Sequence, residues 1–391
     1  MTLPASKPLD VFILAGEESG DILAAGLMRS LAQKRAGPVK YRGVGGHRMM
    51  AAGLQSLYPM DDLTAMGFSA VLGKLPTILK RMRQTVAAIV ANPPDVLVLV
   101  DAPDFTHRVA ARVRKRLPNL LIVKYVAPTV WVWRPGRARA MHGSIDHVLA
   151  LLPFEPEAMY RLGGPETTYV GHPLLSEVPD LQPTASDLAL RNGKPPILLV
   201  LPGSRRMELK RLAQPFGEAL GRLQARGHDF RLVLPTLPRL VDRVAEMTRD
   251  WPARPEIVSG EEAKLAAFRA ARVALAASGT VTLELALAGV PFAAAYRVPG
   301  WEANLVKHFI TGRFATLPNI ILDGPVVPEL IQQDCTAEKL VDALEPLIAD
   351  GPARQAQLDG FAQLDALMST GGVPPSDRAA ETVLTLLASR G

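Results

Sequence analysis

The chain repeats one structural unit along most of its 391 residues: a short apolar run, a turn containing glycine, proline or serine, and a stretch with helical periodicity. This alternation is typical of a parallel β-sheet covered by helices. The apolar runs predict strands at residues 11–15, 96–100, 120–125 and 147–151, and again at 197–201, 231–234, 256–258, 273–276 and 292–295. The predicted helices include residues 22–33, 77–91, 213–225 and 280–288. The sequence therefore predicts an α/β protein with two Rossmann-like, doubly wound domains.

Two domains also follow from length, because 391 residues exceed the size at which a single hydrophobic core usually keeps growing. Between the two series of strands, a segment rich in proline, serine and aspartate has weak periodicity and is interpreted as a linker. We expect an N-terminal domain over residues 1–172, a linker over 173–196 and a C-terminal domain over 197–391, with the last helices packing back on the N-terminal domain as an alternative. The two domains would face a cleft, which is the expected ligand site.

The composition excludes several classes of protein. Cys335 is the only cysteine, which excludes an internal disulfide and a multi-cysteine metal site and favours a reducing compartment. The first residues lack the pattern of a secretion signal, and no apolar stretch approaches the roughly 18 residues of a spanning helix. A cytoplasmic location is therefore expected. The net charge of +6 favours anionic partners, but no pattern typical of nucleic-acid binding accompanies it, so nucleic acid is not an expected partner.

The loop after the first predicted strand reads Gly-Glu-Glu-Ser-Gly-Asp over residues 16–21. Its glycines permit a tight backbone turn, Ser19 or Asp21 can cap the following helix, and the amides at the helix start can bind an anion or a hydroxyl. The loop matches neither the dinucleotide-binding pattern nor a Walker A loop. An ordinary strand-to-helix turn explains it equally well.

Two carboxylates, Asp101 and Asp104, follow the strand predicted at residues 96–100. Ligands of open α/β sheets bind at the carboxyl edge of the strands, where these residues would lie. A carboxylate in a partly apolar cleft can act as a general base for a hydroxyl nucleophile. The alternative is that either residue only caps the turn around Pro103. The Asp-x-x-Asp spacing is not the Asp-x-Asp pair of metal-dependent sugar transferases, so no metal is implied.

The second domain repeats this design in two loops. Gly203, Ser204 and Arg205 follow its first strand, where glycine lets backbone amides approach a ligand and arginine can bind a phosphate through two hydrogen bonds. Ser-Gly-Thr at residues 278–280 joins a strand to a helix and offers amides to an anion such as a pyrophosphate. Glu284 either binds ribose hydroxyls or simply favours the helix dipole.

An apolar and basic stretch spans residues 63–83. Its members are Leu63, Met66, Phe68, Val71, Leu72, Lys74, Leu75, Ile78, Leu79, Lys80, Arg81 and Arg83. Such a surface can lie in a membrane interface, with its cations near acidic headgroups, or it can be a core-packed helix with a solvated basic face. Pro76 interrupts the pattern and predicts at least two short segments rather than one helix.

A second aromatic and basic loop follows the strand at residues 120–125. It contains Trp131, Trp133, Arg134, Arg137 and Arg139. Recognition of a lipid phosphate and plain packing of the tryptophans both fit this composition. The isolated histidines lack the spacing of a zinc site.

Seven short segments, taken together, resemble the bacterial lipid A disaccharide synthase family. They are Ala-Gly-Glu-Glu-Ser-Gly-Asp at 15–21, Asp-Ala-Pro-Asp-Phe at 101–105, Val-Trp-Val-Trp-Arg at 130–134, Leu-Pro-Phe-Glu at 152–155, Leu-Pro-Gly-Ser-Arg at 201–205, Ala-Ser-Gly-Thr at 277–280 and Leu-Pro-Asn at 317–319. Each is weak alone, but their joint order and spacing are specific. The resemblance implies an inverting glycosyltransferase of the GT-B fold, which binds the acceptor mainly through its N-terminal domain and the UDP-sugar mainly through its C-terminal domain.

The same resemblance implies a reaction. UDP-2,3-diacylglucosamine would donate its sugar to the 6-hydroxyl of 2,3-diacylglucosamine 1-phosphate, giving a β-1,6-linked disaccharide 1-phosphate and UDP with no cofactor or metal. The product is a precursor of lipid A, the lipopolysaccharide anchor of Gram-negative-type bacteria. Alternatives are another UDP-GlcNAc-dependent GT-B enzyme, an epimerase, or a non-catalytic protein that binds a nucleotide-sugar or lipid.

The resemblance also assigns roles to residues. Asp101 would be the catalytic base. UDP-sugar contacts would come from Gly203, Ser204, Arg205, Ser278, Gly279, Thr280, Glu284 and Asn319, and acceptor contacts from Glu17, Ser19, Gly20, Asp21, Trp133 and Arg134. Because both substrates carry acyl chains, the stretch from Leu63 to Leu79 is expected to bind the anionic inner face of the cytoplasmic membrane. A homodimer built through the C-terminal region is a further implication.

Overall fold

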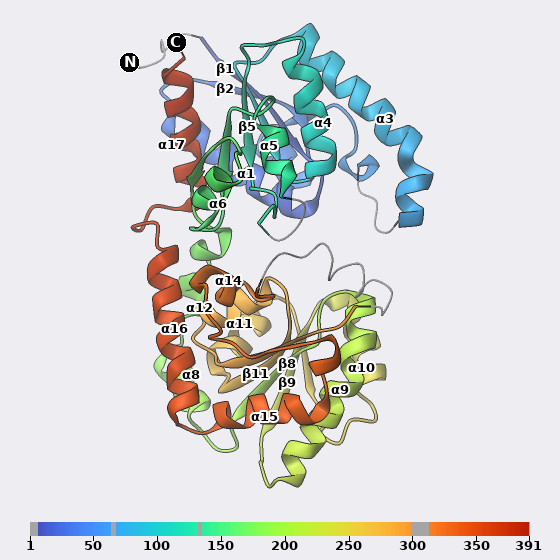
Figure 1. Ribbon diagram of the computed structural model, residues 1–391, viewed down its shortest axis with the longest axis vertical. Helices are drawn as coiled ribbons and strands as arrows, with labels where there is room; N and C mark the ends of the chain where they lie inside the picture. Colours follow the sequence, from blue (N-terminus) through green and yellow to red (C-terminus); the bar gives the residue numbers. More distant parts are fainter. Residues whose placement is uncertain (1–6, 64–67, 132–134, 299–312, 391) are drawn as a thin grey trace. The chain divides into compact units, whose positions relative to one another are not determined.

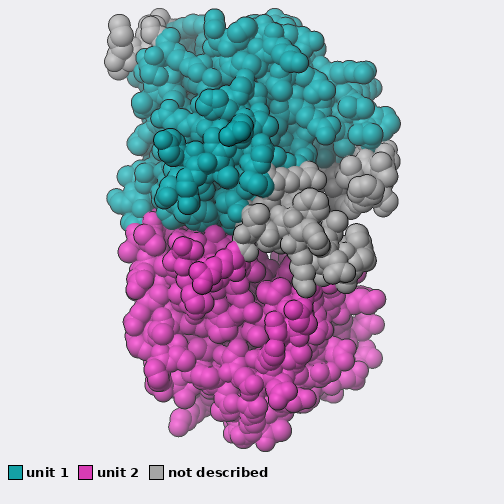
Figure 2. Space-filling model, viewed as in Figure 1, with its two compact units in different colours: residues 1–175, 369–391 teal, residues 176–368 magenta. Residues whose placement is uncertain are grey.

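The computed structural model describes residues 7–63, 68–131, 135–298 and 313–390, and describes residues 68–74 by their backbone alone. The chain divides into two compact units (Figures 1 and 2). Unit 1 contains residues 1–175 and 369–391, and unit 2 contains residues 176–368. Each unit has its own sheet and its own hydrophobic core.

Unit 1 is built on a seven-stranded sheet in which all strand pairs are parallel. In spatial order the strands are β3 (Gln55–Ser56), β2 (Val39–Val44), β1 (Leu9–Ala15), β4 (Val96–Val100), β5 (Leu121–Tyr125), β6 (His147–Ala150) and β7 (Glu166–Tyr169). The order reverses once, between β1 and β4. The connections leave these two neighbouring strands in opposite directions, and the carboxyl ends at such a reversal are where folds of this class bind ligands.

Helices cover both faces of this sheet (Figure 1). They are α1 (Glu18–Lys34), α2 (His47–Ala51), α3 (Phe68–Ala91), α4 (Pro103–Arg114), α5 (Gly136–Met141), α6 (Glu155–Arg161) and α17 (Pro375–Ala388). Side chains alternate along each strand, so Ile13 of β1 packs with α1 and α17, while its neighbours Phe12 and Leu14 pack with α3 and α4. Burial on both faces explains why a central strand such as β4 is continuously apolar.

Unit 2 repeats the design with six parallel strands. In spatial order they are β10 (Glu256–Ser259), β9 (Arg231–Thr236), β8 (Ile197–Leu201), β11 (Val273–Ala277), β12 (Phe292–Tyr296) and β13 (Glu329–Ile331). Its helices are α7 (Val178–Leu181), α8 (Ala185–Arg191), α9 (Arg206–Ala225), α10 (Val241–Met247), α11 (Glu261–Ala270), α12 (Val281–Leu287), α14 (Leu317–Leu322), α15 (Ala337–Ile348) and α16 (Pro352–Met368). The reversal here lies between β8 and β11.

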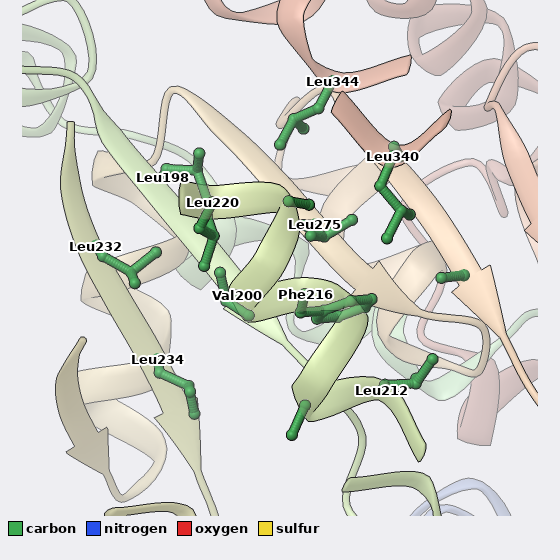
Figure 3. Packing of buried hydrophobic residues seen from close by; sticks show 14 of the residues in the cluster. Leu198, Val200, Leu212, Phe216, Leu220, Leu232, Leu234, Leu275, Leu340 and Leu344 are labelled. Atoms are coloured by element: carbon green, nitrogen blue, oxygen red, sulfur yellow. The ribbon is translucent and has the colours of Figure 1, made fainter. Parts of the chain in front are cut away.

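The core of unit 2 forms where one face of the sheet meets α9 and α15 (Figure 3). Leu198 and Val200 of β8 pack in one cluster with Phe216 of α9 and Leu340 of α15. These helices bury an apolar stripe against an apolar sheet face, which is the main source of stability in this architecture.

The chain passes between the units twice, and on each side of these crossings a helix is fastened to its own unit. The segment predicted as a linker contains a 3₁₀ turn (Pro173–Ser176), α7 and α8, and the buried Arg191 at the end of α8 donates to the carbonyls of Phe268, Arg269, Ala288 and Gly289. Helix α17 returns to unit 1 and packs on α1, where Ser30 Oγ donates to Asp377 at 2.7 Å.

The two-domain α/β prediction is confirmed, and every predicted strand is present with ends within two residues of the prediction. The prediction of two segments around Pro76 is wrong, because α3 runs through it. Proline removes one backbone donor, but the burial of Met82, Val86 and Ile89 against the sheet holds the helix that continues beyond it. Among the described residues, no helix is both long and apolar enough to cross a membrane.

Candidate functional site

A pocket of about 650 Å³ lies in unit 2 at the carboxyl ends of β8, β9 and β11. Its walls come from the loops after these strands and from α11 and α12. They include Gly203, Ser204, Arg205, Glu208, Thr236, Leu237, Gly260, Glu261, Lys264, Phe268, Ser278, Gly279, Thr280 and Glu284. The pocket coincides with the reversal of strand order between β8 and β11, the position at which the topology predicts a ligand. The two loops that the sequence predicts as ligand sites, at residues 203–205 and 278–280, therefore line one cavity.

Two of the glycines that line the pocket, Gly203 and Gly279, differ in whether the protein requires a glycine at their position. Gly203 has φ of +106°, and a Cβ at this position would lie 2.6 Å from a Glu208 carboxylate oxygen. Only glycine adopts this backbone conformation without strain. A Cβ on Gly279 would meet no atom within 4 Å. The protein itself therefore does not require glycine at position 279.

Arg205 is the most exposed of the charged groups predicted for this pocket, with 80% of its side chain accessible. Its Nη1 donates to Glu208 Oε1 at 3.0 Å, and its backbone N–H donates to Glu208 Oε2 at 3.3 Å. Glu208 thus closes the turn at the start of α9, and it binds both the backbone N–H and the guanidinium of Arg205. An exposed guanidinium at the mouth of a pocket can bind a phosphate.

Lys264 of α11 is a pocket residue that the sequence analysis missed. Its Nζ lies 2.5 Å from Glu284 Oε2. Burial alone would lower the pKa of Lys264, but the carboxylates of Glu284 and Glu261 raise it above its ordinary value, so the side chain is a cation. The local sequence of α11 does not distinguish Lys264 from an ordinary surface lysine. Lys264 lines the pocket only because α11 lies close to α12, which carries Glu284.

Asn319 does not line this pocket in the described structure, and its side chain is buried. Its Nδ2 donates to the carbonyl of Val327 at 2.8 Å and to Glu329 Oε1 at 2.9 Å, and its Oδ1 accepts the N–H of Val327 at 2.7 Å. Asn319 therefore fastens α14 to the segment leading into β13. The ligand contact expected of Asn319 stays a prediction.

In unit 1, Asp101 lies directly after β4, at the reversal between β1 and β4. Asp101 and Ala102 have φ of +47° and +41°, in the left-handed region. Such conformations cost about 1–3 kcal/mol each for residues other than glycine and are concentrated at functional sites. The surrounding contacts must offset this cost.

The first loop of unit 1 packs directly against this turn. A Cβ on Gly16 would lie 2.8 Å from the Cβ of Ala102, and a Cβ on Gly20 would lie 3.7 Å from that of Asp101. Ser19 Oγ donates to Asp101 Oδ2 at 3.4 Å. Gly16 is therefore needed for this close packing, whereas a Cβ at Gly20 would make only ordinary van der Waals contact. The structure brings the predicted base together with the first loop.

The capping role predicted for Ser19 or Asp21 is wrong, because α1 begins at Glu18 and contains both residues. Asp21 is 1% exposed, and its carboxylate accepts the backbone N–H groups of Gly46, Arg48 and Met49 at 2.8–3.1 Å. It therefore holds the start of α2, because the first amides of a helix have no partner within the helix itself. The acceptor contact expected of Asp21 competes with this structural role.

Lys124 of β5 is a second residue that the sequence analysis missed. It is 1% exposed, and its Nζ donates to the backbone carbonyl of Asp101 and to Thr106 Oγ1. Burial lowers the pKa of Lys124 to about 7, against the opposing effect of the Asp101 and Glu17 carboxylates. A signal existed in the sequence, because a lysine in an otherwise apolar strand needs a partner once it is buried.

The aromatic loop is described in part. Trp133 and Arg134 lie outside the described residues. The Nε1–H of Trp131 donates to Glu155 Oε1 at 3.4 Å, and the Trp131 ring packs edge-on against Phe154. Packing therefore accounts for this tryptophan.

Glu155 is buried and anchors the end of β6. Its Oε2 accepts the backbone N–H groups of Leu151 and Leu152 at 3.0 and 2.9 Å. Burial raises the pKa of Glu155 to about 7, although these hydrogen bonds and that of Trp131 act in the opposite direction.

The predicted membrane surface is also described in part. Met66 and the side chains of Phe68, Val71, Leu72 and Lys74 lie outside the description. Leu63 is half-buried against the core of unit 1, whereas Leu75 and Leu79 of α3 are 41% and 37% exposed. Arg81, in contrast, is paired with Asp62 at 2.7 Å. In the part of the chain that the structure describes, no three His, Cys, Asp or Glu side chains come together as a metal site.

Comparison with known proteins adds independent findings. A family model described as lipid-A-disaccharide synthetase matches residues 11–373. The curated lipid-A-disaccharide synthase of Rhodopseudomonas palustris (strain HaA2) is 52% identical over 377 residues, covering 96% of each protein. The curated lipid-A-disaccharide synthase of Nitrobacter hamburgensis is 52% identical over 388 residues, covering 99% of this chain and 98% of the relative.

Solved structures agree at the level of fold. A glycosyltransferase from Rickettsia africae ESF-5 is 12% identical with a TM-score of 0.58, covering 99% of this chain and 100% of that one. A UDP-GlcNAc 2-epimerase from Neisseria meningitidis, solved with UDP-GlcNAc, is 11% identical with a TM-score of 0.62, covering 96% of this chain and 100% of that one. The two doubly wound domains are thus those of the GT-B class.

The buried Glu155 predicts a pH-dependent stability. Between pH 4.5 and about 7 the unfolded chain ionises this carboxyl while the folded chain keeps it protonated, so the free energy of unfolding should fall by about 3 kcal/mol as the pH rises through this window. Glu155→Gln should remove most of this decline, as measured by urea unfolding at pH 4.5, 6 and 8. An unchanged pH profile in the variant would contradict the assignment.

Proposed function

Because the chain belongs to the lipid-A-disaccharide synthetase family, we propose that it transfers 2,3-diacylglucosamine from UDP-2,3-diacylglucosamine to the 6-hydroxyl of 2,3-diacylglucosamine 1-phosphate. The chain is a glycosyltransferase enzyme of lipid A biosynthesis with the GT-B fold. The observation that carries the proposal is the pocket of about 650 Å³ in unit 2, which gathers Arg205, Lys264 and the Ser278–Thr280 loop at the strand-order reversal.

The chemical step forms one bond and breaks another. The acceptor 6-oxygen attacks the anomeric carbon as the bond from that carbon to the oxygen of the UDP diphosphate breaks, and its electron pair leaves with UDP. Asp101 takes the proton of the attacking hydroxyl. Attack from the side opposite the leaving group inverts the anomeric carbon, so one base suffices and no covalent intermediate forms.

The pocket of unit 2 suits the nucleotide of the donor. Its walls combine the apolar ring of Phe268 with the cationic groups of Arg205 and Lys264. The cations would stabilise the charge that develops on UDP as it leaves. Gly203, Ser204, Ser278, Gly279 and Thr280 would contact the diphosphate, and Glu284 the ribose. Asn319 would also contact the UDP-sugar, in addition to holding α14.

The carboxyl edge of the unit 1 sheet, at β1 and β4, suits the acceptor. Asp101 lies at the carboxyl ends of β1 and β4 with Ser19 beside its carboxylate. Glu17, Ser19 and Gly20 would contact the sugar, and Trp133 and Arg134 the remainder of the acceptor. Asp21 follows this loop directly, and its hydrogen bonds to the start of α2 would hold the end of the loop in place.

The surface of α3 suits the acyl chains of both substrates. Leu75, Leu79 and Arg83 succeed one another at intervals of four residues and are exposed, while Met82, Val86 and Ile89 face the core. Apolar side chains beside cations bind an anionic membrane interface. We therefore propose a peripheral location at the inner face of the cytoplasmic membrane. The homodimer that the family resemblance implies is a separate part of the proposal.

The activity is tested with the purified protein, UDP-2,3-diacylglucosamine and 2,3-diacylglucosamine 1-phosphate, followed by mass spectrometry of the products. We expect a disaccharide 1-phosphate and UDP, with and without EDTA. Asp101→Asn should lower kcat by at least about 100-fold, because it removes the base. A non-acylated acceptor is the control, and its preferred use would favour another GT-B transferase.

The nucleotide pocket is tested with a matched pair of glycines. Gly279→Ala adds a methyl group into the pocket, whereas Gly351→Ala adds one elsewhere in unit 2, and neither Cβ meets an atom within 4 Å. Both variants should keep the melting temperature of the wild type. Calorimetric titration with UDP should give a Kd about tenfold higher for Gly279→Ala only. Equal affinities would exclude the loop from the binding site.

The membrane surface is tested by sedimentation with vesicles that contain anionic phospholipid. Leu75→Gln with Leu79→Gln should lower binding at low salt by about tenfold, because two partly exposed leucines no longer enter the interface. Leu188→Gln, at another exposed leucine, is the control and should bind as the wild type does. Equal sedimentation of all three proteins would contradict the assignment to α3.

A further inference from the structure

The position of Lys124 is costly for the protein. It is the fourth of the five residues of β5, a strand that lies between β4 and β6, and its side chain is 1% exposed. Burial of an amine is unfavourable unless its hydrogens find partners, and an apolar side chain of the same length would occupy the space without this cost. The reason for a lysine must therefore lie in what its Nζ contacts.

Those contacts converge on the turn after β4. Lys124 Nζ donates to the backbone carbonyl of Asp101 and, at 3.3 Å, to Thr106 Oγ1. Thr106 Oγ1 itself lies 3.0 Å from the carbonyls of both Asp101 and Ala102. An amine has N–H groups to donate in its neutral and its charged form, so this arrangement does not depend on protonation.

The turn needs such support because of its backbone. Asp101 and Ala102 both have positive φ, a conformation that favours glycine. The N–H of Asp101 still continues the sheet by donating to the carbonyl of Tyr125 at 3.1 Å. The carbonyl of Asp101, in contrast, accepts hydrogen bonds from two side chains, those of Lys124 and Thr106. Lys124 thus binds the peptide group between Asp101 and Ala102, next to the carbon that carries the Asp101 side chain.

We propose that Lys124 is a positioning residue, which fixes the left-handed turn at Asp101 and so directs the carboxylate of Asp101 toward the acceptor hydroxyl. The inference rests on the proposed function, in which Asp101 is the base. Lys124 itself contacts no substrate, because its side chain is buried behind the turn. Displacement of a catalytic group by about 1 Å can lower a rate by about 100-fold, so support of this kind has a measurable effect.

The test compares three variants of the full chain: Lys124→Met, Thr106→Val and Asp101→Asn. Methionine fills the space of lysine without its donors, and valine replaces threonine without its hydroxyl. Lys115→Met, at an exposed lysine of unit 1, is the control. For each protein, kcat, KM for both substrates and the melting temperature at pH 7 are measured.

We expect Lys124→Met to lower kcat by about 100-fold, with both KM values within about twofold of the wild type. Its melting temperature should equal or exceed that of the wild type, because a costly buried amine is gone. Thr106→Val should lower kcat by about tenfold, and Lys115→Met should change nothing. This combination of a lost rate and a retained stability is not expected of a residue that only supports the fold.

Three results would overturn the inference. The first is a kcat of Lys124→Met within twofold of the wild type while Asp101→Asn is inactive, which would leave the proposed function intact. The second is a Lys124→Met protein that is unfolded or less stable than the wild type, which would make Lys124 a structural residue. The third is an active Asp101→Asn, which would refute Asp101 as the base and the inference with it.

Discussion

Both units depend on the same constraint, a parallel sheet that is buried on both faces and whose strand order reverses once. Parallel strands require a crossover after each strand, so every loop that follows a strand appears at the same edge of its sheet. At the reversal, neighbouring crossovers go to opposite faces and no helix fills the gap between them. Asp101 and the Ser278–Thr280 loop occupy the corresponding place in the two units, although their sequences are unrelated.

The fold could be predicted from the sequence wherever burial on both faces leaves a continuous apolar run, as in β4 and β8. Strand β2 escaped prediction because it carries Lys40 and Arg42. Arg42 is tolerated there because its guanidinium pairs with Asp10 at 2.9 Å and lies over the ring of Phe12. The short strands β3, β7 and β13 at the sheet edges depend on pairing with their neighbours, which no local pattern reveals.

The candidate site was predictable as a set of loops but not as a set of contacts. The positions of Asp101, Arg205 and Gly279 follow from strands that the sequence reveals. The function of Asp21 and Lys124 does not, because each binds backbone atoms of a segment far along the chain. The local sequence around a residue that hydrogen-bonds a distant loop does not differ from that around a residue without such a contact. Only the tertiary structure distinguishes them.

Helix α17 has a consequence for the order in which the protein is completed. Since α17 packs on α1 and belongs to unit 1, the polypeptide enters unit 2 after residue 175 and leaves it after residue 368. Unit 2 is thus an uninterrupted stretch that a ribosome delivers whole, whereas unit 1 must wait for its last helix until unit 2 has been synthesised. During that interval α1 lacks the helix that packs on it through contacts such as Ser30 to Asp377, and the apolar cluster that Ala379, Ala380 and Val383 complete is open to chaperones or to aggregation.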